Sequence, residues 1–104
     1  MLIGERAQYE ILVPSASSIV NAYVTGPEGI SSVQREYTFP HTEDADGASL
    51  IRTSELRYVF TTPKLLSVGY YDIENLTDFG PQIMGRLHVN DVTSGELRKD
   101  LGAP

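Results

Sequence analysis

The sequence predicts an all-β protein, built as an antiparallel β-sandwich or a jelly-roll-like barrel of about seven strands, with a short C-terminal helix. Apolar residues alternate with polar ones in segments such as 33–39 and 56–60. A period of two is that of a strand with one buried face and one wet face. Turn signals that contain Gly and Pro separate these segments along most of the chain. We expect one sandwich domain over residues 1–92 and a tail over 93–104.

The first two strands are expected at 8–13 and 18–25. The first strand alternates, and Pro14 ends it because proline cannot donate a hydrogen bond to a ladder. The second is apolar on both faces, which is typical of a central strand. The sequence Gly-Pro-Glu-Gly at 26–29 predicts a turn directly after it, since proline presets φ and glycine accepts a positive φ.

The next two strands flank a long polar loop over 40–49. Segment 32–39 alternates, and its expected inward face consists of Val33, Tyr37 and Phe39. Arg35 falls on that same face, so it must either lie near the rim or pair with an acid. Residues 50–53 form a shorter candidate strand after the loop.

Three strands are expected in the second half of the chain. Segment 55–60 is the clearest of them. In 65–75 the apolar phase slips beside Gly69, and a β-bulge at that glycine explains the slip. The sequence Asp-Phe-Gly-Pro at 78–81 predicts a turn. The last strand follows, and its expected inward face consists of Ile83, Gly85, Leu87 and Val89.

The tail carries a helix signature. Thr93 and Glu96 fit a capping box, in which the two side chains satisfy free backbone N–H groups. Leu97 and Leu101 are four residues apart, so a helix would place both on one face. A helix this short is not stable alone. Either the tail is frayed or docked on its own sandwich, or it grips a neighbouring subunit through Leu97 and Leu101.

Composition excludes several classes of function. The formal net charge is -6, and the 8 Lys and Arg residues are scattered. This argues against nucleic acid as a partner, because affinity for phosphates comes mostly from clustered basic side chains. With no cysteine, the chain has no disulfide, no thiolate zinc site and no cysteine nucleophile. No stretch approaches the roughly 20 apolar residues of a membrane span, so we expect no membrane partner either.

The acidic loop contains the best candidate for a metal site. Asp44, Asp46 and Gly47 match the third, fifth and sixth positions of a calcium-binding loop, where oxygen ligands precede a turn-making glycine. The match fails where Thr42 and Thr53 replace acids. A solvated hairpin loop is the alternative, because runs of charge are usually hydrated surface.

The two histidines are the remaining candidates for acid–base chemistry, because imidazole titrates near neutrality. Neither His41 nor His88 has a useful neighbour in the sequence, and His88 falls on the outer face of its strand. The chain contains no Gly-x-Ser-x-Gly elbow, no glycine-rich phosphate loop and no His-Glu-x-x-His motif. We therefore expect a protein that is not an enzyme and that carries no cofactor.

Two features bear on carbohydrates. The triplet at 75–77 matches the N-glycosylation sequon, but such triplets are common by chance, and we interpret it as a turn. Tyr70 and Tyr71 point to opposite faces of one strand, so one of them is a candidate stacking platform for a sugar. The absence of tryptophan weakens this interpretation.

Two functions remain open from the sequence. The first is a structural protein that packs into a larger symmetric assembly, such as a virion decoration, neck or tail component, with other subunits and copies of itself as partners. The location would then be the virion. The second is a binding or accessory module that presents loops to a carbohydrate or protein ligand.

Overall fold

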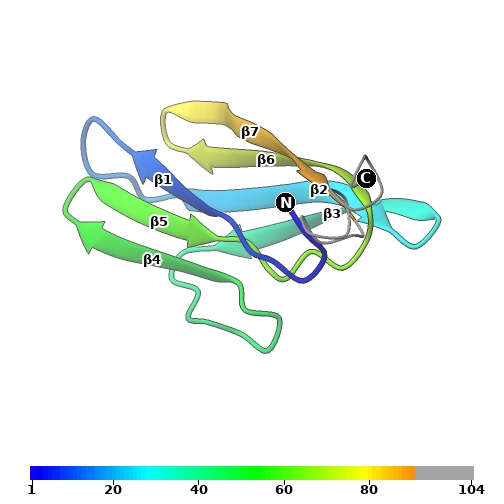
Figure 1. Ribbon diagram of the computed structural model, residues 1–104. Coiled ribbons are helices and arrows are strands. Elements are labelled where there is room, and N and C mark those ends of the chain that lie inside the picture. Colours follow the sequence, from blue (N-terminus) through cyan, green and yellow to red (C-terminus); the bar gives the residue numbers. More distant parts are fainter. Residues whose placement is uncertain (91–104) are drawn as a thin grey trace, which may run out of the picture.

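The computed structural model describes residues 1–90, which form seven strands in two antiparallel sheets (Figure 1). The all-β prediction is confirmed, and no helix occurs in this part of the chain. The expected C-terminal helix, with Leu97 and Leu101, lies outside the described residues. The strands are β1 (Gln8–Leu12), β2 (Val20–Glu28), β3 (Ser31–Thr38), β4 (Ser49–Ser54), β5 (Arg57–Thr61), β6 (Gly69–Thr77) and β7 (Gly80–Val89).

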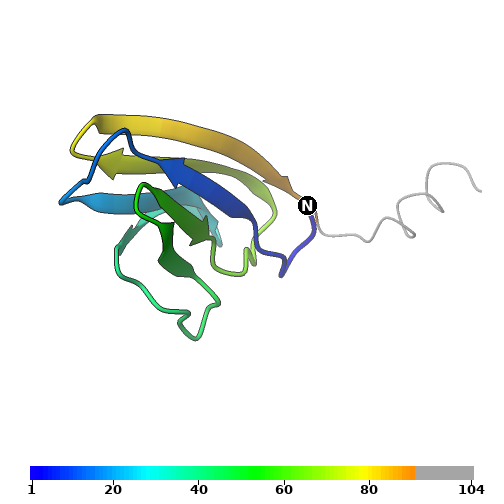
Figure 2. The same ribbon diagram turned by 90° about the vertical axis from the view of Figure 1, so that its left-hand side faces the viewer.

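The two sheets have the strand orders β1-β5-β4 and β3-β2-β6-β7. The four-stranded sheet curves over the three-stranded one (Figure 2). Chain connections alternate between hairpins within a sheet (β2–β3, β4–β5, β6–β7) and crossings from one sheet to the other. If the strands are lettered B, C, C′, D, E, F and G in chain order, the sheets read B-E-D and C′-C-F-G. This is the strand order of an immunoglobulin-type sandwich without a full first strand.

Two isolated bridges join segments outside the regular ladders. Leu2 pairs with Asn90 in parallel, so the N-terminal residues extend the sheet beside the end of β7. His41 pairs with Leu50 in the antiparallel sense, which attaches the chain after β3 to the edge of β4. The sandwich is therefore partly closed along both of its sides.

The core lies between the inward faces of the two sheets. Its largest fully buried apolar side chains are Phe60, Ile11, Leu50, Ile73 and Val89, which come from five strands and both sheets. Full burial of each such side chain stabilises the fold by roughly 1.5–3 kcal/mol. The alternation read from the sequence therefore assigned most inward positions correctly, and the short segment at 50–53 is a strand.

The expected turn at 26–29 is wrong in its position. β2 continues through Gly26 and Pro27, and the chain reverses only at Gly29 (φ 64°) and Ile30. Proline is tolerated because the pairing of β2 with β6 already ends at Thr25, so Pro27 has a strand partner on one side only. In the same way, the turn expected at 78–81 is shorter, because β7 begins at Gly80.

The expected bulge at Gly69 is also wrong. Gly69 is the first residue of β6 and pairs regularly with Val89. The register shift lies further along, where Met84 of β7 is the extra residue between the pairs Ile73–Gly85 and Glu74–Ile83. A bulge reverses the facing of the residues beyond it. Ile83 therefore points outward and is 78% exposed, contrary to its expected inward position.

Candidate binding site

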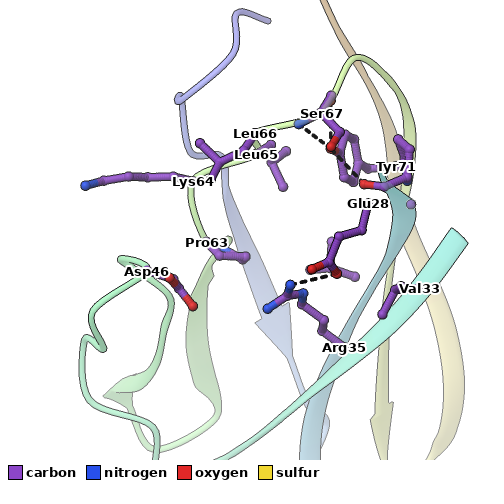
Figure 3. Close-up of a pocket in the computed structure, with 13 residues that line it drawn as sticks. Glu28, Val33, Arg35, Asp46, Pro63, Lys64, Leu65, Leu66, Ser67 and Tyr71 are labelled. Carbon is purple, nitrogen blue, oxygen red and sulfur yellow. Dashed lines mark hydrogen bonds and ion pairs between the residues drawn. The ribbon is translucent and has the colours of Figure 1, made fainter. Parts of the chain in front are cut away.

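A pocket of about 140 Å³ opens between the sheets at one end of the sandwich (Figure 3). This end, called here the pocket end, consists of the β2–β3 hairpin at 29–30 and the β5–β6 connection at 62–68. The two segments are joined by a hydrogen bond from the N–H of Gly29 to Oγ of Ser67 at 3.4 Å. Its apolar lining includes Val24, Val33, Leu65 and Leu66.

Tyr71 forms the inner wall of the pocket. Its hydroxyl donates to the carbonyl oxygen of Ser67 at 2.7 Å and accepts the N–H of the same residue at 3.2 Å (Figure 3). A tyrosine near the start of strand F that bonds the backbone a few residues upstream is the tyrosine corner of immunoglobulin-type sandwiches. Ile73, two residues on, stands where antibody domains carry a cysteine. The Tyr-x-Ile spacing at the start of β6 was therefore the overlooked signal for this fold.

Gly26 explains how the ring of Tyr71 fits there. A Cβ atom on Gly26 would lie 2.7 Å from Cε2 of the ring, and closer still to Cδ2. A glycine in β2 thus leaves room for the aromatic ring that crosses it. This close approach depends on the pairing of β2 with β6, and neither segment shows it alone.

Charged side chains stand at the mouth of the pocket. Arg35 donates to a carboxylate oxygen of Glu28 at 2.8 Å, and this hydrogen bond raises the pKa of Arg35 above its usual value. Both alternatives expected for Arg35 therefore hold, because it stands at the rim and pairs with an acid. Asp46 also faces the pocket, and it makes no ion pair within residues 1–90 (Figure 3).

The size of the pocket limits what it can bind. A cavity of about 150 Å³ holds a molecule as large as benzene, whereas drug-sized ligands need roughly 300 Å³ or more. The pocket therefore suits one large apolar side chain rather than a sugar or a cofactor. The charges at its mouth can pair with polar groups next to that side chain.

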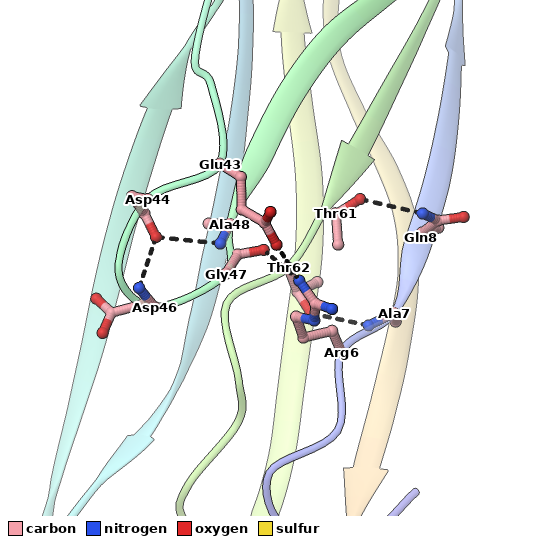
Figure 4. A network of polar contacts seen from close by, with 10 residues as sticks. All are labelled: Arg6, Ala7, Gln8, Glu43, Asp44, Asp46, Gly47, Ala48, Thr61 and Thr62. Atoms are coloured by element: carbon pink, nitrogen blue, oxygen red, sulfur yellow. Dashed lines mark hydrogen bonds and ion pairs between the residues drawn. The ribbon is translucent and has the colours of Figure 1, made fainter.

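The acidic loop uses its carboxylates to fold itself. Asp44 Oδ1 accepts the N–H groups of Asp46 and Ala48 at 2.8 and 3.1 Å (Figure 4). Its other oxygen lies 2.8 Å from Nε2 of His41. The side chain of Asp46 points away from that of Asp44 (Figure 4). The calcium-loop hypothesis for Asp44 and Asp46 stays a prediction that this arrangement does not favour, and residues 1–90 contain no cluster of three or more possible metal ligands.

The loop is also tied to the N-terminal segment. Arg6 donates to Glu43 at 2.6 Å and to the carbonyl oxygen of Gly47 at 3.1 Å (Figure 4). These contacts place the loop beside the three-stranded sheet, where Ala7 N–H donates to the hydroxyl of Thr62. These contacts fix the position of the acidic loop and form no reactive centre.

His41 has a partner that the sequence did not reveal. Its bond to Asp44 is the largest cause of the lowered pKa of that carboxyl group. The ring of His41 also meets that of Tyr37 edge-on at 5.2 Å. No serine, threonine or tyrosine hydroxyl is hydrogen-bonded to His41 in the described part of the chain. Within the described residues, His41 and Asp44 therefore correspond to the base and the orienting acid of a catalytic triad, without the nucleophile.

His88 lies on the outer face of the four-stranded sheet, as expected. It stacks on Tyr70 with ring centroids 4.5 Å apart, and the guanidinium of Arg86 lies 5.6 Å from the same tyrosine ring. Arg86 is in turn paired with Asp72 at 2.8 Å. Tyr70 is exposed and Tyr71 is buried, so their opposite facing is confirmed. The ring of Tyr70 is already engaged by two side chains, which weakens its case as a platform for a sugar.

The sequon at 75–77 lies within β6 and forms no turn. Asn75 points into the core and is 3% exposed. An enzyme cannot reach its amide in the folded protein, so the triplet is not a surface glycosylation site.

Sequence comparison identifies no relatives: no protein-family model matches the chain, and no curated protein is significantly similar to it. A search of residues 1–90 for a helix long and apolar enough to cross a bilayer finds none. The class of the protein therefore rests on the fold, an immunoglobulin-type β-sandwich with a side-chain-sized pocket between its sheets.

Proposed function

We propose that this chain is a non-enzymatic structural protein that packs into a larger symmetric assembly, with copies of itself among its partners. The observation that carries the proposal is the exposure of large apolar side chains at both ends of the sandwich. Exposed apolar clusters on a soluble domain mark interaction sites. A virion decoration, neck or tail component is one such assembly.

The pocket end is the first of the two apolar regions. Ile30 at the tip of the β2–β3 hairpin is fully exposed, and Leu66 is 70% exposed. Val68 lies in the same connection and is about half exposed. Leu66 lines the pocket, and Ile30 and Val68 lie at the same end of the sandwich, so an interface at this end would cover the pocket as well.

The second region lies at the other end of β2 and is called here the turn end. It consists of the β1–β2 loop at 13–19 and the β6–β7 turn, which Asp78 joins by accepting the N–H of Ser18 at 2.7 Å. Ile19, Phe79 and Ile83 are exposed in or beside these segments. Two separate interfaces on one subunit allow an assembly to grow beyond a dimer.

The side chains of residues 1–90 support a non-enzymatic role. His41 and Asp44 are paired without a hydroxyl nucleophile, and His88 is stacked on Tyr70. The charged groups at the pocket are occupied by one another or stand at its rim. Burial of an apolar partner surface is therefore the chemistry that this molecule supports best.

Sedimentation equilibrium over a range of protein concentrations tests the proposal. An assembling subunit gives a mean mass above that of one chain, rising with concentration. Replacing Ile30 and Phe79 by serine removes one apolar contact at each end and should weaken association roughly tenfold or more. Ile51→Ser is the matched control, because Ile51 is exposed on the face of the three-stranded sheet. A wild-type chain that stays monomeric at every concentration contradicts self-assembly.

A second candidate function is a binding module for a carbohydrate or protein ligand, and the pocket is the observation that favours it. A monomeric chain that binds an immobilised glycan or peptide, and loses binding on Val33→Asp, would support this alternative. Its predicted ligand is a peptide, because the pocket accommodates one side chain and the Tyr70 ring is engaged.

A further inference from the structure

We propose that the pocket receives Leu97 or Leu101 from the C-terminal segment of a second copy of the chain, in a reciprocal exchange between two copies that face each other by their pocket ends. This inference rests on the proposed assembly function and names the contact that would begin it. Three features of the molecule argue for it.

The first feature is the match of size and polarity. The pocket has the volume for one large apolar side chain and an apolar lining that includes Val33 and Leu65. Residues 91–104 contain two leucines, Leu97 and Leu101, as their largest apolar side chains. Burial of one leucine in such a site should tighten association roughly tenfold to a hundredfold, and two reciprocal contacts would reinforce each other.

The second feature is charge. Arg98 and Lys99 follow Leu97 directly in the sequence. Asp46 lines the mouth of the pocket and has no ion-pair partner among residues 1–90, whereas Glu28, which also lines the pocket, is paired with Arg35. A basic side chain next to an inserted leucine would therefore meet the carboxylate of Asp46.

The third feature is the point at which the chain leaves the sandwich. Asn90 donates to the carbonyl oxygen of Met1 at 2.8 Å and follows Val89, the last residue of β7, at the pocket end. β7 and β3 are opposite edges of the four-stranded sheet, three strand spacings or about 14 Å apart. The pocket lies beside β3, where Val33 and Arg35 line it.

The direction of the chain favours a second copy over the same copy. At Asn90 the backbone runs outward along the axis of β7, because β6 enters the sheet at this end and β7 is antiparallel to it. Seven further residues reach Leu97 and span at most about 25 Å when extended. To enter its own pocket the segment would have to reverse, whereas a copy facing the same end receives it directly. Contact through the same surface on both copies closes into a two-fold dimer.

Mixed disulfide trapping tests the exchange, because the chain has no natural cysteine. Purified full-length Val33→Cys protein is mixed with Leu97→Cys or with Leu101→Cys protein and oxidised. One of the two mixtures should give about tenfold more disulfide-linked heterodimer than the control mixture with Thr53→Cys, an exposed residue of β4. Adding Asp46→Lys to the Val33→Cys protein should reduce this yield.

A second measurement does not depend on disulfide geometry. Leu97→Asp/Leu101→Asp should lower the association constant of the full chain in sedimentation equilibrium by tenfold or more, on the order of two lost leucine contacts. Ala103→Asp, which adds the same charge beside these positions, should not.

The outcomes separate this inference from the proposed function. The exchange is overturned if crosslinking is no better than in the control and the leucine variants associate as strongly as the wild type. The proposed assembly function still stands in that case if the chain forms oligomers. A double variant, Val33→Cys/Leu97→Cys, that closes within single chains at high dilution shows that the segment occupies its own pocket, which also overturns it. A chain that never associates overturns both.

Discussion

The ring of Tyr71 lies directly against the backbone of Gly26, on the neighbouring strand, with no space for a side chain between them. The hydroxyl at the far end of the same ring is bonded to Ser67, which in turn is bonded to Gly29 at the tip of the hairpin. One tyrosine thus connects β2, the β5–β6 connection and the β2–β3 hairpin. The pocket keeps its shape because these three segments are held together.

Gly26→Ala should destabilise the protein, because the new methyl group would have to displace the buried ring. Overpacking of this kind costs about 1–3 kcal/mol. Urea unfolding of the variant and of the wild type measures this loss in the free energy of unfolding. Gly85→Ala is the matched control and should cost less. A Cβ atom on Gly85 would lie 3.3 Å from the ring of the partly buried Tyr9, a longer distance than any of the contacts at Gly26. The prediction is wrong if the two variants are equally stable.

Tyr71→Phe should cost about 1–2 kcal/mol, because the backbone groups of Ser67 lose a buried hydrogen-bonding partner. Tyr70→Phe serves as the comparison, since Tyr70 is the adjacent residue and is 59% exposed. Thermal unfolding of the two variants should show a lowered midpoint for the first alone. Equal midpoints would mean that the corner contributes nothing.

Arg35→Met should change stability by less than about 1 kcal/mol, because its ion pair with Glu28 is about half exposed and such pairs contribute little. The same substitution should alter association at the pocket end, where it removes a charge from the mouth. A large loss in the unfolding free energy, measured in urea, would show that the pair is structural instead.

Stability should fall in acid partly through Asp44. Its pKa is lowered in the folded state, chiefly by the hydrogen bond from His41, so the folded protein binds this proton less readily than the unfolded chain does. The contribution of Asp44 to stability is therefore complete above the unfolded pKa of about 3.9, and it is lost as the pH falls through the folded pKa.

Asp44→Asn tests this contribution, because it keeps the acceptor for the Asp46 and Ala48 N–H groups. We expect it to show a shallower loss of urea stability between about pH 6 and pH 2 than the wild type. Identical pH profiles would exclude this contribution.

Calcium should leave the unfolding temperature unchanged, since both oxygens of Asp44 are occupied by the loop and by His41. Differential scanning calorimetry with calcium and with a chelator measures this directly. A rise with calcium that Asp46→Asn abolishes would establish the metal loop after all.

The comparison of sequence and structure has a consistent pattern. Arg35 was expected either near the rim or paired with an acid, and it stands at the pocket mouth and pairs with Glu28. Tyr70 and Tyr71 were expected on opposite faces and lie there. The errors concern the turns at 26–29 and 75–77, the bulge at Gly69 and the inward facing of Ile83. Each of these depends on where one strand pairs with another, which the residues of a single segment do not encode.

What the sequence determined by itself was the number of strands and the buried face of most of them, because alternation is a local property of each extended segment. Tertiary structure alone decided the placement of the Met84 bulge, the fit of Gly26 under Tyr71 and the approach of His41 to Asp44. The physical reason is that register is set by pairing between segments far apart in the chain, and one added residue reverses the facing of all that follow. The pocket between the sheets is a product of that register.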